Sequence, residues 1–286
     1  LRPAAASAAE SIMADTSMIP AELILLLLAI GCVGGFLSGL LGVGGGIIFV
    51  PALFFSLSSL GFSEDHAMHI AIGSSLAVVM ATGSTSAFSH YKRGGVDMAI
   101  LRGWGPAIVI GVVVGAMLAS SVKSVVLKEI FAGMTMLIAV YMAFSKDKAE
   151  PKPMRFLTEK VQKGIAALVG VISAMLGVGG AILTVPLMTC VGLPMPRAVG
   201  TGAALGVAVA VPGVISYMVS GMLVSDTLPP WSIGYVNLLT VAMIIPSSML
   251  LAPVGVRLSH NMPRAMLRRV FAVVLVIVSV RMFMSL

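Results

Sequence analysis

Long apolar runs separated by short polar segments make up most of the chain. The runs cover approximately residues 19–41, 46–60, 67–89, 99–121, 125–144, 163–176, 181–193, 196–220, 232–256 and 266–286. Most of them hold the roughly 20 apolar residues with which a helix crosses a hydrocarbon core of about 30 Å. The pattern therefore predicts an all-α polytopic membrane protein.

A polar stretch from Lys146 to Lys163 divides these runs into two sets of five. We expect four segments along the chain: a flexible N-terminal segment over 1–18, a first membrane repeat over 19–145, a linker over 146–162 and a second membrane repeat over 163–286.

Two glycine-rich motifs stand at corresponding places in the two sets. Residues 35–51 and 170–186 align with ten identities in seventeen positions, including both Leu-Gly-Val-Gly-Gly stretches and the Val-Pro pairs that follow them. Residues 115–132 also align with 255–272 without a gap. We interpret this pattern as an internal duplication. A broken apolar helix at the same place in two halves indicates a solute site in a membrane transporter.

The runs on either side of the second motif are too short to cross a bilayer alone. At about 1.5 Å per residue, 163–176 and 181–193 each reach roughly 20 Å. They form either a glycine-broken pair of helices or a re-entrant hairpin with the glycines at its tip. Such irregular backbone is tolerated at membrane depth only where it is buried in protein or lines a wet cavity.

Basic residues gather in the loops that fall on one side of the membrane, over 90–98, 145–163, 194–197 and 257–269. By the positive-inside rule that side is cytoplasmic. We expect both termini outside, the 146–162 linker in the cytoplasm, and the protein in the cell inner membrane. Each half then makes an odd number of net crossings. This gives two inverted-topology repeats, each with a glycine-broken helix pair or re-entrant hairpin plus three spanning helices.

The glycine motifs suit the binding of an anion. A helix that begins after a glycine break presents free backbone N–H groups and the positive end of its dipole. We expect such starts near Gly46 and Ala181, both directed at the middle of the membrane without a buried cation, which favours a small anion. The alternative is that the glycines only permit close helix contact. The candidate binding glycines are Gly42, Gly44, Gly45, Gly46, Gly177, Gly179 and Gly180.

Hydroxyl groups could complete this site. Candidates are Ser74 and Ser75 in the first half and Thr201 in the second, although a hydroxyl in a membrane helix often bonds its own i−4 carbonyl instead. Ser38 and Ser173 lie one turn before the breaks. Asn237 is a costly amide in an apolar helix, and its partner is either a neighbouring helix or the substrate.

Histidines stand near the expected segment ends. His66 and His69 lie at the outer end and His90 at the inner end, where we expect solvated loop positions rather than proton relays.

Composition excludes several other classes of protein. The chain is 58% hydrophobic and 10% charged, with a mean hydropathy of +1.08, so its solvent is lipid. The net charge of +7 fits basic cytoplasmic loops, and we expect no nucleic-acid partner. The glycine motifs lack the spacing of a dinucleotide fingerprint and the lysine of a P-loop. Because no catalytic triad, metal cluster or cofactor motif occurs, we expect neither an enzyme nor a cofactor or metal.

The motifs resemble the TauE/SafE family of sulfite exporter-like membrane proteins. The resemblance rests on both Leu-Gly-Val-Gly-Gly stretches with their trailing Val-Pro, on Ala71–Ser75, and on Gly234–Leu238 continuing to Ala252–Leu258. It covers nearly all of 20–286. Ser74 stands where threonine is common in the family, and the hydroxyl is kept. The resemblance implies transport of sulfite, sulfoacetate or a related small organosulfur anion, usually outward; the residues alone indicate only a small anion.

Our leading hypothesis is a secondary carrier that exports such an anion by alternating access around the paired breaks. An exported anion gains about 2.3 kcal/mol per charge per 100 mV when the cell is negative inside. An anion channel, an importer of a small sulfur-containing anion, and a membrane scaffold remain alternatives. The sequence leaves the oligomeric state open, a homodimer included.

Overall fold

The computed structural model describes residues 21–41, 45–59, 64–144, 158–190, 192–260, 262 and 264–285. In chain order its helices are α2 (Ala21–Leu41), α3 (Gly46–Ser59), α4 (Glu64–Lys92), α5 (Met98–Ser120), α6 (Ser124–Phe144), α7 (Glu159–Leu176), α8 (Ala181–Cys190), α9 (Met195–Gly221), α10 (Leu238–His260) and α11 (Arg264–Met284). The predicted segment 1–18 and most of the predicted linker, 146–157, lie outside the described residues.

The predicted apolar runs correspond closely to these helices, with one correction. The run 232–256 does not begin as a helix. The 3₁₀ turn η2 (Met222–Thr227) and an antiparallel hairpin of β1 (Ser232–Ile233) and β2 (Val236–Asn237) come first, and α10 begins at Leu238. The hairpin turns through Gly234, whose φ is 54°. Glycine adopts this conformation without the Cβ strain that would oppose it in other residues.

The helix α7 begins at Glu159, four residues before the expected start of the second repeat. Its first turn is polar rather than apolar, and Lys163 forms a 2.7 Å ion pair with Glu159 one turn earlier. Such i, i+4 pairs support a solvated helical turn, so the helix extends beyond the apolar run.

Six of the described helices are long and apolar enough to cross a membrane, namely α2, α4, α5, α6, α9 and α10. The chain is therefore a mostly helical, multi-pass membrane protein. Helix α11 is not among the six and carries Arg281 in its last turn. Helix α8 has 10 residues, so at about 1.5 Å per residue it reaches only about 15 Å.

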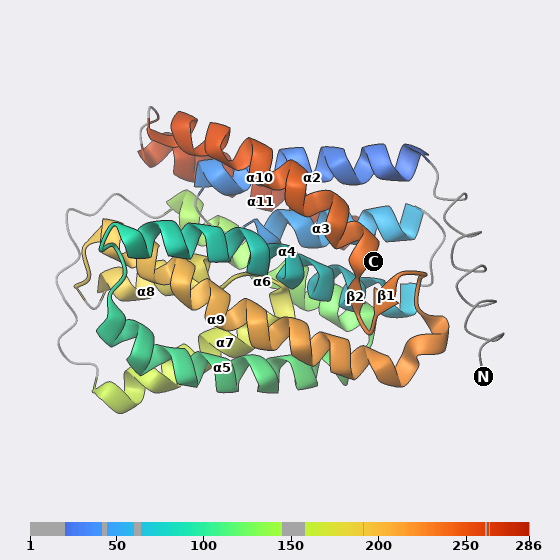
Figure 1. Ribbon diagram of the computed structural model, residues 1–286, viewed down its shortest axis with the longest axis horizontal. Helices are drawn as coiled ribbons and strands as arrows, with labels where there is room; N and C mark the ends of the chain where they lie inside the picture. The colour runs from blue at the N-terminus through green and yellow to red at the C-terminus, as the bar shows by residue number, and fades with distance from the viewer. Residues whose placement is uncertain are drawn as a thin grey trace, which may run out of the picture.

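The helices run nearly parallel in an elongated bundle (Figure 1). Helix α2 lies beside α10 at one edge and α5 beside α7 at the opposite edge, with α4 and α9 between them. The start of α2, the hairpin and the end of α11 lie at one end of the bundle, whereas α6 ends and α7 begins at the other. Each edge pair therefore joins one helix from 21–144 with one from 159–284.

Glycines bring the edge pairs into close contact. Gly35 of α2 packs on the backbone of Ser248 in α10, and Gly170 of α7 packs on the backbone of Ile108 in α5. A Cβ on either glycine would overlap backbone atoms of the partner helix. Small residues at such positions let helix axes approach closely, which is how helices associate in lipid.

Helix α4 forms the centre of the bundle, and every residue from Ala67 to Val79 is buried. The outer helices instead expose large apolar side chains: Ile110 is 64% exposed, Leu137 62% and Leu250 74%. In a membrane protein these faces contact lipid. Small and polar side chains can then pack in the interior of the bundle.

Candidate functional site: the two glycine breaks

Both glycine motifs place a residue with positive φ directly before a helix. Gly45 has a φ of 74° and Gly180 a φ of 70°, and α3 and α8 begin at the next residue. The carbonyl oxygen of Gly45 accepts a hydrogen bond from the N–H of Phe49 at 3.0 Å, and that of Gly180 accepts one from Thr184 at 2.9 Å. The predicted starts of these two helices are confirmed.

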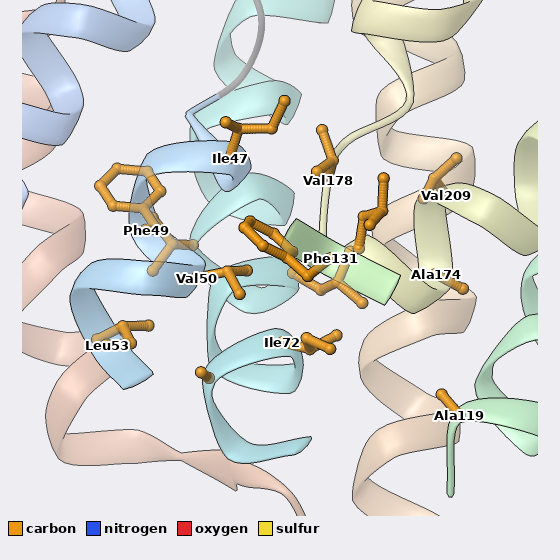
Figure 2. Close-up of a cluster of buried hydrophobic side chains, with 14 of the residues drawn as sticks. Ile47, Phe49, Val50, Leu53, Ile72, Ala119, Phe131, Ala174, Val178 and Val209 are labelled. Carbon is orange, nitrogen blue, oxygen red and sulfur yellow. The ribbon is translucent and has the colours of Figure 1, made fainter. Parts of the chain in front are cut away.

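The two breaks meet inside the bundle. Gly46 packs so closely on the carbonyl group of Gly177 and the Cα of Val178 that a Cβ on Gly46 would overlap them. Ser75 of α4 donates a 2.9 Å hydrogen bond to the same Gly177 carbonyl oxygen. Figure 2 shows Ile47 and Val178 in one buried apolar cluster at this junction.

The second break is enclosed by the two central helices. Gly179 packs against Val79 of α4 and the backbone of Gly206 in α9, and Gly180 packs against Val209 of α9. Both motif glycines are buried. Gly42 and Gly44 of the first motif lie outside the described residues.

Hydrogen-bond acceptors at the second break are occupied, whereas donors are not. The carbonyl oxygens of Ser173, Gly177, Gly179 and Gly180 each accept a hydrogen bond. Within the described part of the chain, no acceptor contacts the backbone N–H of Gly179 or Gly180. Cations are bound by free oxygens and anions by free N–H and O–H groups. The break therefore offers free hydrogen-bond donors, while each of these carbonyl oxygens already accepts a hydrogen bond.

Two hydroxyl groups beside this break also lack a partner among the described residues. Ser173, at the end of α7, and Thr184, in the first turn of α8, are both fully buried. Ser173 Oγ lies 3.5 Å from the position that a Cβ on Gly180 would occupy, and Thr184 Oγ1 lies 3.4 Å from that on Gly202 of α9. Ser173 was among the residues predicted from the sequence, and Thr184 was not.

Ser74 and Asn237 contact each other at the hairpin. Ser74 Oγ accepts a 3.0 Å hydrogen bond from the backbone N–H of Asn237. The prediction that Asn237 lies inside an apolar helix is wrong, because Asn237 ends β2 and its Oδ1 accepts the N–H of Thr240 at 3.0 Å. Its amide nitrogen donates to the Pro230 carbonyl oxygen at 3.0 Å. Asn237 therefore fixes the hairpin to the start of α10.

Thr201 makes the corresponding contact near the start of α9, a helix that begins at the end of the bundle opposite the hairpin (Figure 1). Its Oγ1 accepts a 2.8 Å hydrogen bond from the backbone N–H of Asp97. Asp97 Oδ1 in turn accepts the N–H groups of Ala99 and Ile100 and caps α5. An aspartate directly before an apolar run is an N-cap signal that could have revealed this role. The structure thus brings Ser75 to the breaks, while Ser74, Thr201 and Asn237 bond to helix-capping loops.

His69 is buried in α4, so the expectation of a solvated loop histidine is wrong for this residue. Its ring stacks on Tyr235 with centroids 4.9 Å apart, and its Nε2 lies 3.0 Å from the Ala119 carbonyl oxygen. The Tyr235 hydroxyl lies 3.5 Å from Nδ1 of His66. Burial raises the pKa of Tyr235, so its hydroxyl stays protonated. The error arose because α4 begins at Glu64, which places His69 in its second turn.

Lys128 is a buried cation that the sequence analysis missed. It lies in the second turn of α6 and is 3% exposed. Its Nζ donates to the Ser285 carbonyl oxygen at 2.7 Å and lies 5.0 Å from the ring centroid of Phe54 in α3. The cation–π contact and the hydrogen bond compensate its desolvation. The bundle therefore holds a buried cation, although the expectation from the sequence concerned only the two helix starts at the glycine breaks.

A cavity of about 240 Å³ lies between α2 and α3, apart from the motif glycines. Its lining consists of Ala29, Ile30, Val33, Ile48 and Ala52. None of these side chains can donate a hydrogen bond, so the cavity does not have the chemistry of an anion site.

Comparisons with known proteins agree on a transporter family. The family model described as "Sulfite exporter TauE/SafE" matches residues 27–282. A "Probable membrane transporter protein" of Haemophilus influenzae is 32% identical over 264 residues, which is 92% of this chain and 98% of that relative. The "Probable membrane transporter protein YunE" of Bacillus subtilis is 26% identical, over 88% of this chain and 94% of its own length. No solved structure matches the chain.

Proposed function

Because the chain belongs to the TauE/SafE family of membrane transporters, we propose that it is a secondary carrier for a small organosulfur anion. Sulfite and sulfoacetate are the first candidates for its substrate, and export is the proposed direction. The family is described by sulfite export, and an anion that leaves a cell with a negative interior gains about 2.3 kcal/mol per charge per 100 mV.

The meeting of the two glycine breaks is the observation that carries this proposal. Gly46 at the start of α3 contacts the backbone of Gly177, and the N–H groups of Gly179 and Gly180 have no acceptor among the described residues. A helix start adds the positive end of its dipole to such free donors. Neutral donors bind an anion more weakly than a buried arginine would, which suits a site that must also release its substrate.

Matching contacts in the two halves support an inverted-repeat architecture. Ser74 accepts the N–H of the residue that caps α10, and Thr201 accepts the N–H of Asp97, which caps α5. The contact of Gly35 with α10 likewise has its counterpart in the contact of Gly170 with α5. A pseudo-two-fold relation in the membrane plane accounts for these pairs and for their positions at opposite ends of the bundle.

Alternating access is the mechanism that we propose. The second break is buried between α4 and α9, and the Ser75 hydroxyl holds the Gly177 carbonyl group. Relative movement of the two halves would open this region first to one side and then to the other. Glycines at the helix contacts leave few interlocking side chains to oppose such sliding.

For the orientation, we propose that the end of the bundle with the hairpin faces outward from the inner membrane. The opposite end carries exposed basic residues, among them Lys92, Arg93, Lys160 and Arg197. By the positive-inside rule this end belongs in the cytoplasm. Both termini would then face outward, and the 146–162 linker would be cytoplasmic.

Flux in proteoliposomes tests the proposed function. We expect saturable uptake or release of sulfite or sulfoacetate, little flux of sulfate, and counterflow when the unlabelled anion is present on the other side. Gly179→Leu should abolish the flux, because its side chain would collide with Val79. The matched control is Gly133→Leu, whose position faces open space on α6.

Several outcomes would overturn the proposal. Absence of flux for every organosulfur anion would reject the substrate class, and undiminished flux in Gly179→Leu would reject the site. Single-channel currents without counterflow would indicate an anion channel instead. Strictly inward net transport under a physiological membrane potential would indicate an importer.

A further inference from the structure

We infer that Ser173 and Thr184 bind the oxygen atoms of the substrate at the second glycine break, and that the site selects an anion bearing several oxygens. This inference rests on the proposed function, because it assigns the ligand groups of the same transport site. It concerns two side chains whose hydroxyl groups make no hydrogen bond within the helices that carry them.

Many other hydroxyl groups in the bundle bond to their own helix. Thr82 Oγ1 donates to the Val78 carbonyl oxygen at 3.0 Å, and Ser248 Oγ donates to that of Ile245 at 3.0 Å. This is the usual solution for serine and threonine in membrane helices. Ser173 and Thr184 are fully buried and make no such bond among the described residues. A buried hydroxyl without a partner costs about 1–3 kcal/mol, so two of them at one place require an explanation.

Both hydroxyls lie where a ligand of the break would bind. Ser173 Oγ lies 3.5 Å from the Cβ position of Gly180, whose own N–H is free within the described residues. Thr184 lies one turn into α8, and side chains on a helix lean toward its N-terminus. Ser173 thus lies against Gly180 at the start of α8, and Thr184 lies in the first turn of the same helix, facing Gly202 of α9.

The arrangement identifies the chemical class of the ligand. The two hydroxyls and the N–H groups of Gly179 and Gly180 are all donors, and the carbonyl oxygens beside them already accept other hydrogen bonds. Donors that come from α7, from the break itself and from α8 approach from different directions. A sulfite or sulfonate group has three oxygens that can accept from separate directions, whereas a halide offers a single centre. The groups therefore suit an oxyanion better than a halide, and they offer a cation only the two hydroxyl oxygens.

The first break does not offer the same set. The position that corresponds to Thr184 in the aligned motifs is Phe49, which is buried and packs against Gly45. An aromatic side chain cannot donate a hydrogen bond to an oxyanion. We therefore place the binding of the substrate's oxygen atoms at the second break rather than at both breaks.

Two variants and two matched controls test this inference in the full-length protein. In proteoliposomes, Ser173→Ala and Thr184→Val should each raise the KM for sulfite or sulfoacetate by about tenfold, the effect of one lost hydrogen bond to a charged group. The conservative variants Ser173→Thr and Thr184→Ser should recover part of the affinity. Ser248→Ala and Thr82→Val remove hydroxyls that are already bonded in their own helices, so they should leave KM unchanged.

Thermal unfolding without substrate gives a second, independent readout. Removal of an unpartnered hydroxyl should leave the melting temperature of Ser173→Ala and Thr184→Val unchanged or higher. Added sulfite should raise the melting temperature of the wild type, and chloride at the same ionic strength should not. Stabilisation by sulfite should be weaker in both variants.

The outcomes separate this inference from the proposed function. If flux in the wild type is lost in Gly179→Leu but KM is unchanged in Ser173→Ala and Thr184→Val, the glycine site stands and the hydroxyl assignment is wrong. If chloride stabilises the wild type as well as sulfite does, the selection for several oxygens is wrong. If the wild type moves no organosulfur anion, the proposed function itself fails.

Discussion

Replacement of Gly46 by alanine tests the contact on which the candidate site depends. A Cβ at this position would overlap the carbonyl oxygen of Gly177 and lie 2.9 Å from the Cα of Val178. Both are backbone atoms, so no rotation of a side chain can relieve the overlap, and the two breaks must separate. Forced overpacking of this kind costs typically about 1–3 kcal/mol.

Gly133→Ala provides the matched control. Gly133 lies inside α6, and no atom lies within 4 Å of its Cβ position. Alanine there should stabilise the helix by up to about 1 kcal/mol, because glycine is a poor helix former. The two variants should therefore differ by roughly 1–4 kcal/mol in the free energy of unfolding, with Gly46→Ala the less stable.

The difference can be measured by reversible unfolding in mixed micelles, followed by the helical circular dichroism signal. Gly46→Ala should also lose transport, since the start of α3 would move away from the second break. Combining it with Val178→Ala should restore neither property, because the overlap does not involve the Val178 side chain. If Gly46→Ala proves as stable as Gly133→Ala, the two breaks do not meet as described.

Two further predictions concern the loops and the hairpin. Asn237→Ala and Asp97→Ala each remove a helix cap, and each should lower the free energy of unfolding by about 1–2 kcal/mol in chemical denaturation; equal stability to the wild type would show that the caps are dispensable. His69→Phe should keep the aromatic stack on Tyr235 but remove one of two donors to the Ala119 carbonyl oxygen, which keeps the N–H of Val122 at 3.3 Å, at a cost of about 0.5–1.5 kcal/mol. His69→Gln, which can still donate, should lose less, and the reverse order would contradict the assigned hydrogen bond.

Features that depend on local sequence were predictable. Gly45 and Gly180 interrupt apolar runs, and the helices begin directly after them. The duplicated motif also indicated that the two breaks belong together, and the contact of Gly46 with Gly177 agrees with that expectation. Hydrophobic runs locate helices in a membrane protein because an unpaired backbone in lipid is so costly.

Features that depend on a distant partner were not predictable. Asn237 reads as part of an apolar run, but its backbone N–H donates to Ser74, 163 residues earlier in the chain, and the residue lies in the hairpin. His69 is buried because Ala119 and Tyr235 cover it, and both are remote in the chain. Whether a hydroxyl such as that of Thr184 bonds within its own helix depends on rotamer and packing, which periodicity does not report.

The exchange of helices between the halves has a consequence for biosynthesis. The glycine face of α2 can pack on its partner only after α10 has been synthesised, and α5 can pack on its partner only after α7 has been synthesised. At a synthesis rate of about 5–20 residues per second, α10 leaves the ribosome on the order of 10–40 s after α2. Throughout that interval the glycine face of α2 must rest against lipid or the insertion machinery. The amino-terminal half is therefore not a self-contained folding unit, and the bundle closes only when the last helices arrive.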